Sequence, residues 1–167
     1  MGRWRPPREK SSPYISQTGI EALRKELRQL WKIERPQVTE IVHQAALNGD
    51  RSENGDYIYG KKRLREIDYR VRYLTNRIED AIIVEYSPTQ EGKVFFGAYV
   101  ELENDSELTV EYRLVGSDEL DPSKGYISID SPMAKALIGK SLDDEISVQT
   151  PEGLAIWYIN KIRYKHS

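Results

Sequence analysis

The sequence predicts an α+β protein in which an N-terminal antiparallel α-helical coiled-coil hairpin is followed by a small α+β domain. Apolar residues recur at three- and four-residue steps up to about residue 82, and they alternate with polar residues beyond it. Turn-forming residues at 48–57 interrupt the helical pattern. The charge also changes sign: residues 1–82 carry 17 basic and 12 acidic side chains, whereas residues 83–167 carry 8 and 15.

The composition excludes several classes of protein. The chain has 167 residues, of which 38% are hydrophobic and 31% charged, enough for one ordinary domain or for a rod with a small domain. It has no cysteine, which excludes disulfides and thiolate metal sites. No apolar run is long enough to cross a membrane, and residues 1–10 lack the apolar segment of a secretory signal. We expect a cytoplasmic monomer that binds no membrane.

The first thirteen residues are predicted to be a disordered basic arm. They contain four cations and several prolines, and they show no apolar periodicity. Such a segment contacts nucleic acid or a partner only loosely.

The first helix of the hairpin is expected to run from about Thr18, as its N-cap, to about Asn48. Gly49 then supplies the residue of positive φ that commonly ends a helix. About thirty residues at 1.5 Å each give a rod of roughly 45 Å. Pro36 lies inside this rod and removes a backbone hydrogen bond, so we expect a kink near Arg35.

The second helix has a clearer apolar seam. Its members are Tyr57, Leu64, Ile67, Val71, Leu74, Ile78 and Ala81. Gly60 and Lys61 take the place of one expected core residue, and an interior glycine costs a helix about 1 kcal/mol relative to alanine. Gly55 adds a second such position, so fraying is expected near the tip. Two helices that each carry an apolar seam, joined by a short connector, are expected to bury these seams against each other as an antiparallel coiled coil.

The second half of the chain alternates with the period of strands. Strands are predicted at 94–102 and 108–114, joined as a hairpin by the turn residues 103–107. Ser131 and Pro132 are a typical N-cap and first residue of a short helix that extends through Leu137 and is closed by Gly139. Further strands are expected around this helix, at 127–129, 146–148 and 154–164.

Asp50 and Glu53, at the predicted tip, allow four interpretations. They fit a capping box at the start of the second helix. In such a box the Asp50 side chain accepts from the backbone amide of residue 53, and the Glu53 side chain reaches back to the backbone amide of residue 50. A second interpretation is a calcium-binding loop, in which Asp50, Ser52, Asn54 and Gly55 would take positions 1, 3, 5 and 6. Position 12 of that loop would be Lys61, however, where a bidentate glutamate is needed. A third interpretation is a hydrolase with paired carboxylates, although a hairpin tip offers no cleft. The fourth is that the two carboxylates act inside another protein's active site, where they share a hydrated Mg²⁺.

The chain resembles the bacterial Gre transcript-cleavage factors, and the GreB type more than the GreA type. The matching segments, which fall across nearly the whole chain from about Tyr14, are Gly49–Asn54 with Asp56 and Tyr57, Lys61–Asp68, Arg70–Thr75, Tyr86–Pro88, Glu91–Ala98 and Tyr126–Ala134. The resemblance implies an N-terminal coiled coil, residues 14–82, that enters the secondary channel of bacterial RNA polymerase. It implies an FKBP-like domain, residues 83–167, that docks at the channel rim.

The same resemblance implies the activity. A factor of this kind is not itself an enzyme; it stimulates the polymerase's own cleavage of the RNA 3′ segment in backtracked complexes. Asp50 and Glu53 match the acidic tip of the family and would share Mg²⁺ with the polymerase active site, with no cofactor of the factor's own. The alternatives are a regulator that occupies the channel without promoting cleavage and, by analogy of fold alone, a free-standing prolyl isomerase.

Two further groups of residues are candidates for binding. Seven cations and two anions lie between Lys61 and Arg77, a pattern typical of a solvated helix face and also of a phosphate-binding face. In a factor that meets an extruded RNA end, the candidates for RNA binding are Lys61, Lys62, Arg65 and Arg72. The corner Asp130–Ser131–Pro132 is our candidate for contact with polymerase, although helix capping alone also explains Ser131 and Pro132.

Overall fold

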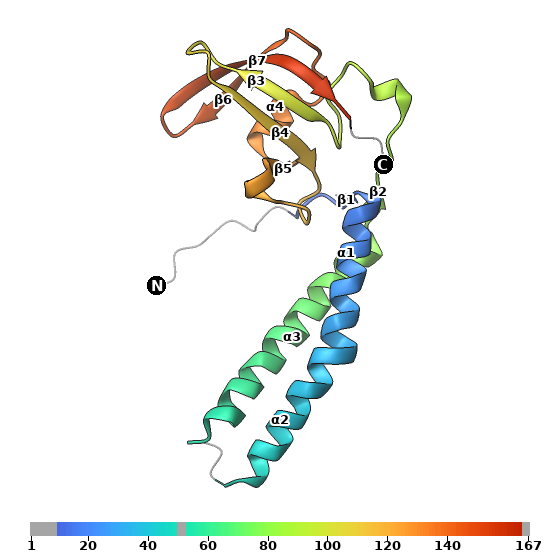
Figure 1. The fold of residues 1–167 in the computed structure, drawn as a ribbon, viewed down its shortest axis with the longest axis vertical. Coiled ribbons are helices and arrows are strands. Elements are labelled where there is room, and N and C mark those ends of the chain that lie inside the picture. Colours follow the sequence, from blue (N-terminus) through green and yellow to red (C-terminus); the bar gives the residue numbers. More distant parts are fainter. Residues whose placement is uncertain (1–9, 50–52, 165–167) are drawn as a thin grey trace. The chain divides into compact units, whose positions relative to one another are not determined.

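The computed structural model describes residues 10–49 and 53–164. The chain divides into two compact units, one formed by Thr18–Ala81 and the other by the segments that flank it, up to Gln17 and from Ile82. The first unit is a helical hairpin and the second is built on a curled sheet with a short helix (Figure 1). The predicted α+β fold class is therefore confirmed.

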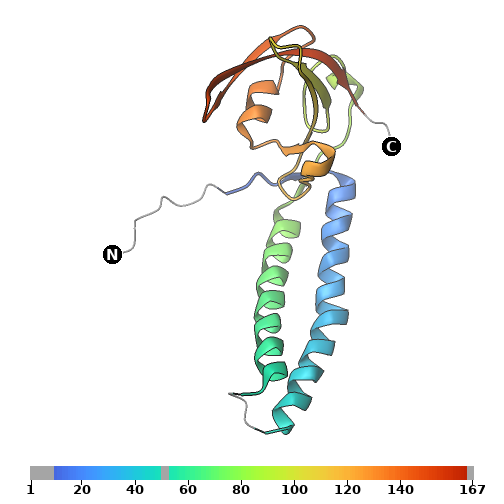
Figure 2. The same cartoon turned by 60° about the vertical axis from the view of Figure 1, so that its left-hand side comes forward.

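The hairpin consists of two long arms. One arm joins α1 (Gln17–Arg28), a π-helical segment η1 (Gln29–Glu34) and α2 (Arg35–Leu47). The other is α3 (Gly55–Asp80), which runs antiparallel to the first arm (Figure 2). Because α1 begins at Gln17, the prediction that Thr18 is its N-cap is wrong. At the other end Gly49 has a φ of +125°, in the positive range that was expected there.

The predicted distortion at Pro36 is present, but it lies one turn earlier than expected. The amide of Arg35 donates to the carbonyl of Leu30, five residues before it, and this is the spacing of a π-helix. Pro36 has no amide hydrogen and its ring crowds the preceding turn. The chain therefore widens over Gln29–Glu34, before the proline, and resumes α-helical spacing at Arg35.

The hairpin is held by an apolar seam along both arms. Ile20, Leu23, Leu30 and Ala45 are buried on the first arm, and Ile67 and Leu74 are completely buried on the second. Gly60 is also buried, within a continuous α3. A Cβ atom there would overlap the Cγ2 atom of Val42, so this glycine marks a point of close approach between the helices.

The second unit contains a five-stranded sheet in the order β5-β4-β3-β7-β6. Its strands are β3 (Tyr99–Glu103), β4 (Thr109–Val115), β5 (Tyr126–Ser128), β6 (Glu145–Thr150) and β7 (Gly153–Arg163). β4 and β5 are parallel, and every other pair is antiparallel. The helix α4 (Pro132–Leu137) lies on the concave face of the sheet (Figure 2), and Ala134 and Leu137 are completely buried in the core there.

The strand predictions are mostly confirmed. β3 and β4 form the expected hairpin, with Leu102 opposite Val110. The predicted strand 94–102 is wrong in its first half, because the chain turns at Gly97, with a φ of +87°, and strand pairing begins only at Tyr99. Short helical turns η2 (Pro88–Gln90) and η3 (Pro122–Lys124) complete the unit.

One pairing was not expected from the sequence. β1 (Tyr14–Ile15) lies parallel to β2 (Ile82–Ile83), so the residues just before the hairpin and just after it form one small sheet. Ser12, which the predicted disordered arm included, donates its amide to the Asp130 carboxylate at 2.9 Å, and its hydroxyl also donates to that carboxylate. The prediction of disorder is therefore wrong at Ser12. Residues 1–9 of the arm lie outside the described residues.

Candidate functional site

The tip of the hairpin is fixed by Asn54. Its Oδ1 atom accepts a hydrogen bond from the amide of Tyr57 at 3.2 Å, so Asn54 is the N-cap of α3. Its Nδ2 atom donates to the carbonyl of Ala45 at 2.7 Å, a backbone oxygen near the end of α2. One side chain thus caps the second helix and binds the end of the first.

This geometry decides against a capping box formed by Asp50 and Glu53 at the start of α3. α3 begins at Gly55 with Asn54 as its N-cap, so Glu53 precedes the N-cap and does not occupy the third helical position. The carboxylate of Glu53 is exposed and accepts no hydrogen bond from the described residues. Asp50 lies outside the described residues. Glu53 therefore stands at the tip without a structural role in the described chain.

Three of the arginines join the two arms of the hairpin. Arg63 donates to Glu34 at 2.5 Å, Arg70 to Glu26 at 2.9 Å and Arg35 to Asp68 at 2.8 Å. The hydrogen bond from Arg63 holds the pKa of the Glu34 carboxyl below its ordinary value. Because these side chains are partly exposed, each pair contributes only modestly to stability. Their main effect is to fix the register of the arms.

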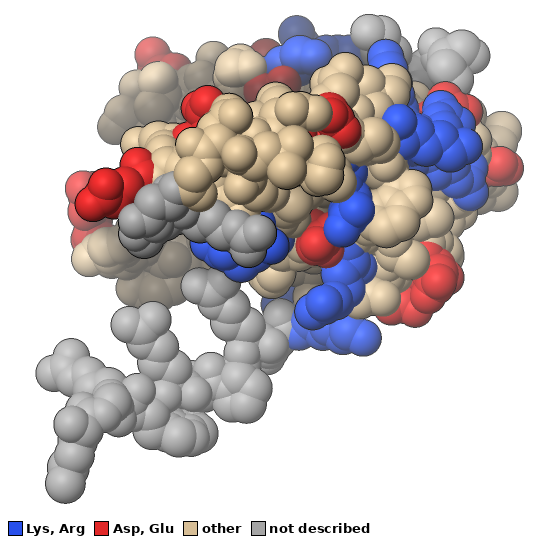
Figure 3. All heavy atoms as spheres, turned by 90° about the horizontal axis from the view of Figure 1, so that it is seen from below, with Lys and Arg blue, Asp and Glu red and all other residues tan. Residues whose placement is uncertain are grey.

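The four predicted RNA-binding cations, Lys61, Lys62, Arg65 and Arg72, differ from these arginines. All are exposed, and none forms an ion pair with a carboxylate among the described residues. A helix turns by about 100° per residue, which puts all four on the side of α3 opposite to the buried Ile67 and Leu74. In the view from below, Lys and Arg side chains gather mainly toward the right-hand side of the surface, with Asp and Glu side chains nearby (Figure 3).

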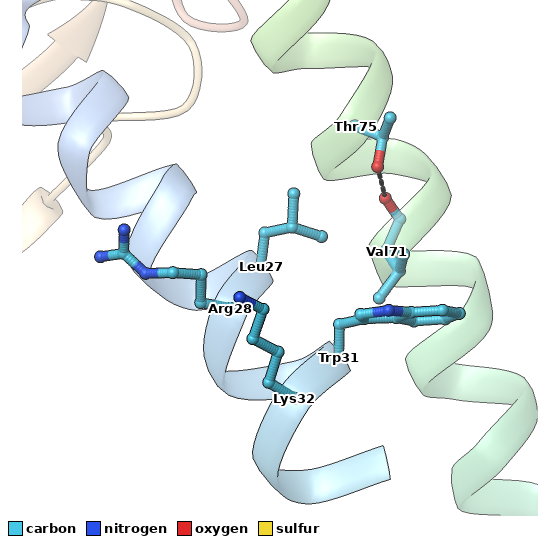
Figure 4. A pocket seen from close by; sticks show the side chains of 6 residues that line it. All are labelled: Leu27, Arg28, Trp31, Lys32, Val71 and Thr75. Carbon is cyan, nitrogen blue, oxygen red and sulfur yellow. Dashed lines mark hydrogen bonds between the residues drawn. The ribbon is translucent and has the colours of Figure 1, made fainter. Parts of the chain in front are cut away.

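A groove of about 400 Å³ lies between the two arms of the hairpin (Figure 4). Its lining residues are Leu27, Arg28, Trp31, Lys32, Val71 and Thr75. The Trp31 ring is half exposed, and the guanidinium of Arg35 lies 5.1 Å from its centre. None of the six lining residues is a carboxylate or a histidine, so the groove lacks the acid–base pair of a hydrolase.

The corner predicted to contact a partner has structural roles in the second unit. The Oγ atom of Ser131 accepts from the amide of Ala134 at 3.2 Å and caps α4, as the sequence suggested. The Asp130 carboxylate accepts both donors of Ser12. Pro132 is exposed at the first turn of α4. Of the three residues, Pro132 is the most exposed, since Asp130 and Ser131 are partly buried.

Sequence reasoning missed Glu119, which holds the chain just before the hairpin. Its carboxylate accepts from the amide and the hydroxyl of Ser16 and from the amide of Gly116, the two amide distances being 3.1 Å each. A side chain at Gly116 would overlap the carbonyl of Tyr14. No local pattern reveals these contacts, since more than one hundred residues separate Ser16 from Glu119.

Neither a membrane-spanning helix nor a metal-binding group is found among the described residues. None of their helices combines the length and the apolar character needed to cross a membrane. Within residues 10–49 and 53–164, no three His, Cys, Asp or Glu side chains come together as a metal-binding group. Neither statement covers Asp50.

Comparison with known proteins gives a consistent result along the chain. The family model described as the N-terminal part of a transcription elongation factor matches residues 13–83. The model described as the GreA/GreB C-terminal part of a transcription elongation factor matches residues 89–164. Together they cover both units of the structure. A solved structure of the GreA factor homologue Gfh1 of Thermus thermophilus aligns over 90% of this chain and 97% of its own, with 25% identity and a TM-score of 0.41.

Curated relatives match at much higher identity. Transcription elongation factor GreB of Pasteurella multocida is 63% identical over 92% of this chain and 98% of its own length. Transcription elongation factor GreB of Pseudomonas aeruginosa is 51% identical over 98% of each chain. At this identity and coverage the relationship is plain, and the chain belongs to the GreA/GreB family of transcription elongation factors.

Proposed function

We propose that this chain is a transcript-cleavage factor that acts on RNA polymerase. Its hairpin enters the secondary channel of the polymerase, and its tip stimulates the polymerase's own cleavage of backtracked RNA, which rescues arrested complexes. The observation that carries the proposal is the exposed Glu53, which has no structural task among the described residues because Asn54 caps α3. The relatives named GreB support the assignment to transcription elongation.

The hairpin suits delivery of a chemical group into a narrow space. α3 has 26 residues, which corresponds to about 39 Å of helix, so the tip lies far from the other end of the hairpin. The hydrogen bond from Asn54 to Ala45 ties the two helix ends together behind the tip. Because Glu53 directly precedes Asn54, the two hydrogen bonds of the Asn54 side chain restrict the position of the Glu53 carboxylate.

Asp50 and Glu53 are the groups that would act at the polymerase active site. Carboxylate oxygens are hard ligands that suit Mg²⁺, and the exposed oxygens of Glu53 are available to such an ion. A Mg²⁺ ion held there would polarise the phosphate and activate water. The chain supplies two ligands and the polymerase supplies the remainder of the site, so the chain stimulates catalysis in trans without being an enzyme itself.

The remaining parts of the chain are assigned to binding. Lys61, Lys62, Arg65 and Arg72 would hold phosphates of the extruded RNA 3′ end without reading its sequence. The unit from residue 83 onward would dock on the polymerase, with Pro132 of the Asp130–Pro132 corner as its most accessible contact. One monomer per polymerase suffices for both contacts.

The proposal is tested with a stalled, backtracked elongation complex. Addition of the chain should shorten the 3′-extended RNA in a manner that depends on Mg²⁺, and the released fragment should carry the original 3′ end. Polymerase alone, under the same conditions, gives the intrinsic rate. Binding to polymerase without acceleration of cleavage would contradict the proposal and would favour a regulator that only occupies the channel.

A further inference from the structure

The outer face of α3 carries an aromatic ring among its cations. Tyr69 is 74% exposed, the most exposed of the large hydrophobic side chains on the described part of α3. It follows Arg65 by four residues and precedes Arg72 by three. Residues at these spacings are neighbours on a helix surface. The ring therefore stands between two cations that have no acidic partner among the described residues.

Helical geometry places this ring on the same side of α3 as three of the four predicted RNA-binding cations. At about 100° per residue, Lys62, Arg65, Tyr69 and Arg72 fall within a stripe about 80° wide. The stripe faces away from the seam that contains Ile67 and Leu74. The paired arginines Arg63 and Arg70 lie beside the seam, where they reach Glu34 and Glu26 on the other arm. Tyr69 is thus separated from the contacts that stabilise the hairpin.

We propose that Tyr69 is a stacking platform for a nucleobase of single-stranded RNA, with the adjoining phosphates held by Arg65 and Arg72. The inference rests on the proposed function, which brings extruded RNA to this hairpin. A phenol ring stacks on any base, because every base has a π-face, and flanking cations neutralise the backbone. Along the helix axis Arg65 lies about 6 Å from Tyr69 and Arg72 about 4.5 Å on the other side.

The position of Tyr69 sets the length of RNA that it can bind. From Gly55 to Tyr69 the helix rises about 21 Å, and a stacked strand advances about 3.4 Å per nucleotide. About six nucleotides of RNA beyond the tip are therefore needed to reach the ring. A complex backtracked by two nucleotides should not use Tyr69, whereas one backtracked by ten nucleotides should.

The experiment compares Tyr69→Ala with the parent chain on these two complexes. On the ten-nucleotide complex the half-saturating concentration of factor should rise about tenfold, since stacking on one aromatic residue is typically of that order. On the two-nucleotide complex it should not change, and Tyr69→Phe should behave as the parent on both. Tyr59, which is 73% exposed but lies on another side of α3, is the matched control, and Tyr59→Ala should show no length-dependent loss.

A second measurement separates this inference from the proposed function. RNA carrying a photoreactive base six to ten nucleotides beyond the tip should crosslink to the peptide that contains Tyr69, whether or not cleavage is accelerated. If the parent chain stimulates cleavage but Tyr69→Ala matches it on the long complex, the platform is refuted and the proposed function stands. Crosslinks that map only to other peptides likewise refute the platform. Absence of stimulated cleavage with a crosslink at Tyr69 would refute the proposed function instead.

Discussion

Gly60 of α3 lies directly against the side chain of Val42 of α2, so closely that a Cβ atom at position 60 would overlap the Cγ2 atom of Val42. The glycine is buried in the seam, near the end of α3 that is closest to the tip. Judged by propensity alone, it weakens the helix. Judged by packing, it allows the two helices to approach near the tip, where a side chain would force them apart.

Replacement of Gly60 by alanine should therefore destabilise the hairpin. The gain in helix propensity is about 1 kcal/mol, but overpacking against a β-branched side chain typically costs about 1–3 kcal/mol. Thermal unfolding should show a lower midpoint for Gly60→Ala, and the double variant Gly60→Ala with Val42→Ala should recover part of the loss. Gly55→Ala is the matched control, since a Cβ there meets only a ring atom of Tyr59 at 4.0 Å. An equal response at positions 55 and 60 would contradict the packing explanation.

Asn54 should be the residue on which the stability of the tip depends. Asn54→Ala removes the cap on Tyr57 and the hydrogen bond to Ala45, and loss of an N-cap alone typically costs about 1 kcal/mol. Asn54→Asp keeps the capping oxygen and loses only the donor, so its effect should be intermediate. Amide hydrogen exchange at Tyr57 measures the change locally. Glu53→Gln should leave that exchange rate unaltered; faster exchange in this variant would show that Glu53 supports the tip after all.

The helical half of the fold could be predicted because its signals are local. Apolar steps of three and four residues indicate both arms, and Pro36 indicates the distortion before it. The details at the tip could not be predicted in the same way. Asp50 with Glu53 and Asn54 with Tyr57 both offer a side-chain acceptor three residues before an amide, and the packing of Asn54 on Ala45 selects between them.

Contacts between segments far apart in the chain could not be predicted from the sequence. Ser12 reaches Asp130 and Ser16 reaches Glu119 across more than one hundred residues, and no periodicity connects them. The same limit applies to the pairing of Tyr14–Ile15 with Ile82–Ile83. The basic residues of α3 could be found in the sequence, but their roles could not be told apart there. The structure shows that Arg63 and Arg70 form ion pairs with glutamates, whereas Lys61 and Arg65 form none with any described carboxylate.

This distinction leads to a test of the basic face by salt. Replacement of Lys61, Lys62 and Arg65 by alanine removes three phosphate contacts, and each contact contributes about 0.7 to the logarithmic salt slope for a single strand. The half-saturating concentration on long backtracked RNA should rise, and the slope should fall by about 2. Arg70→Ala serves as the control, since Arg70 is bound to Glu26 and should leave the slope unchanged. An unaltered slope in the triple variant would show that this face is only solvated.

The tip carboxylates should be needed for cleavage and dispensable for folding. Asp50→Asn with Glu53→Gln removes two charges and preserves shape, and the cap supplied by Asn54 remains, so the thermal midpoint and polymerase binding should change little. If the two carboxylates help to retain a weakly bound Mg²⁺ ion, cleavage should fall by orders of magnitude, each tenfold loss corresponding to about 1.4 kcal/mol of barrier. Raised Mg²⁺ should then restore part of the rate, because mass action compensates for weaker binding. Near-normal cleavage by this folded double variant would mean that the hairpin acts without its carboxylates, by occupying the channel alone.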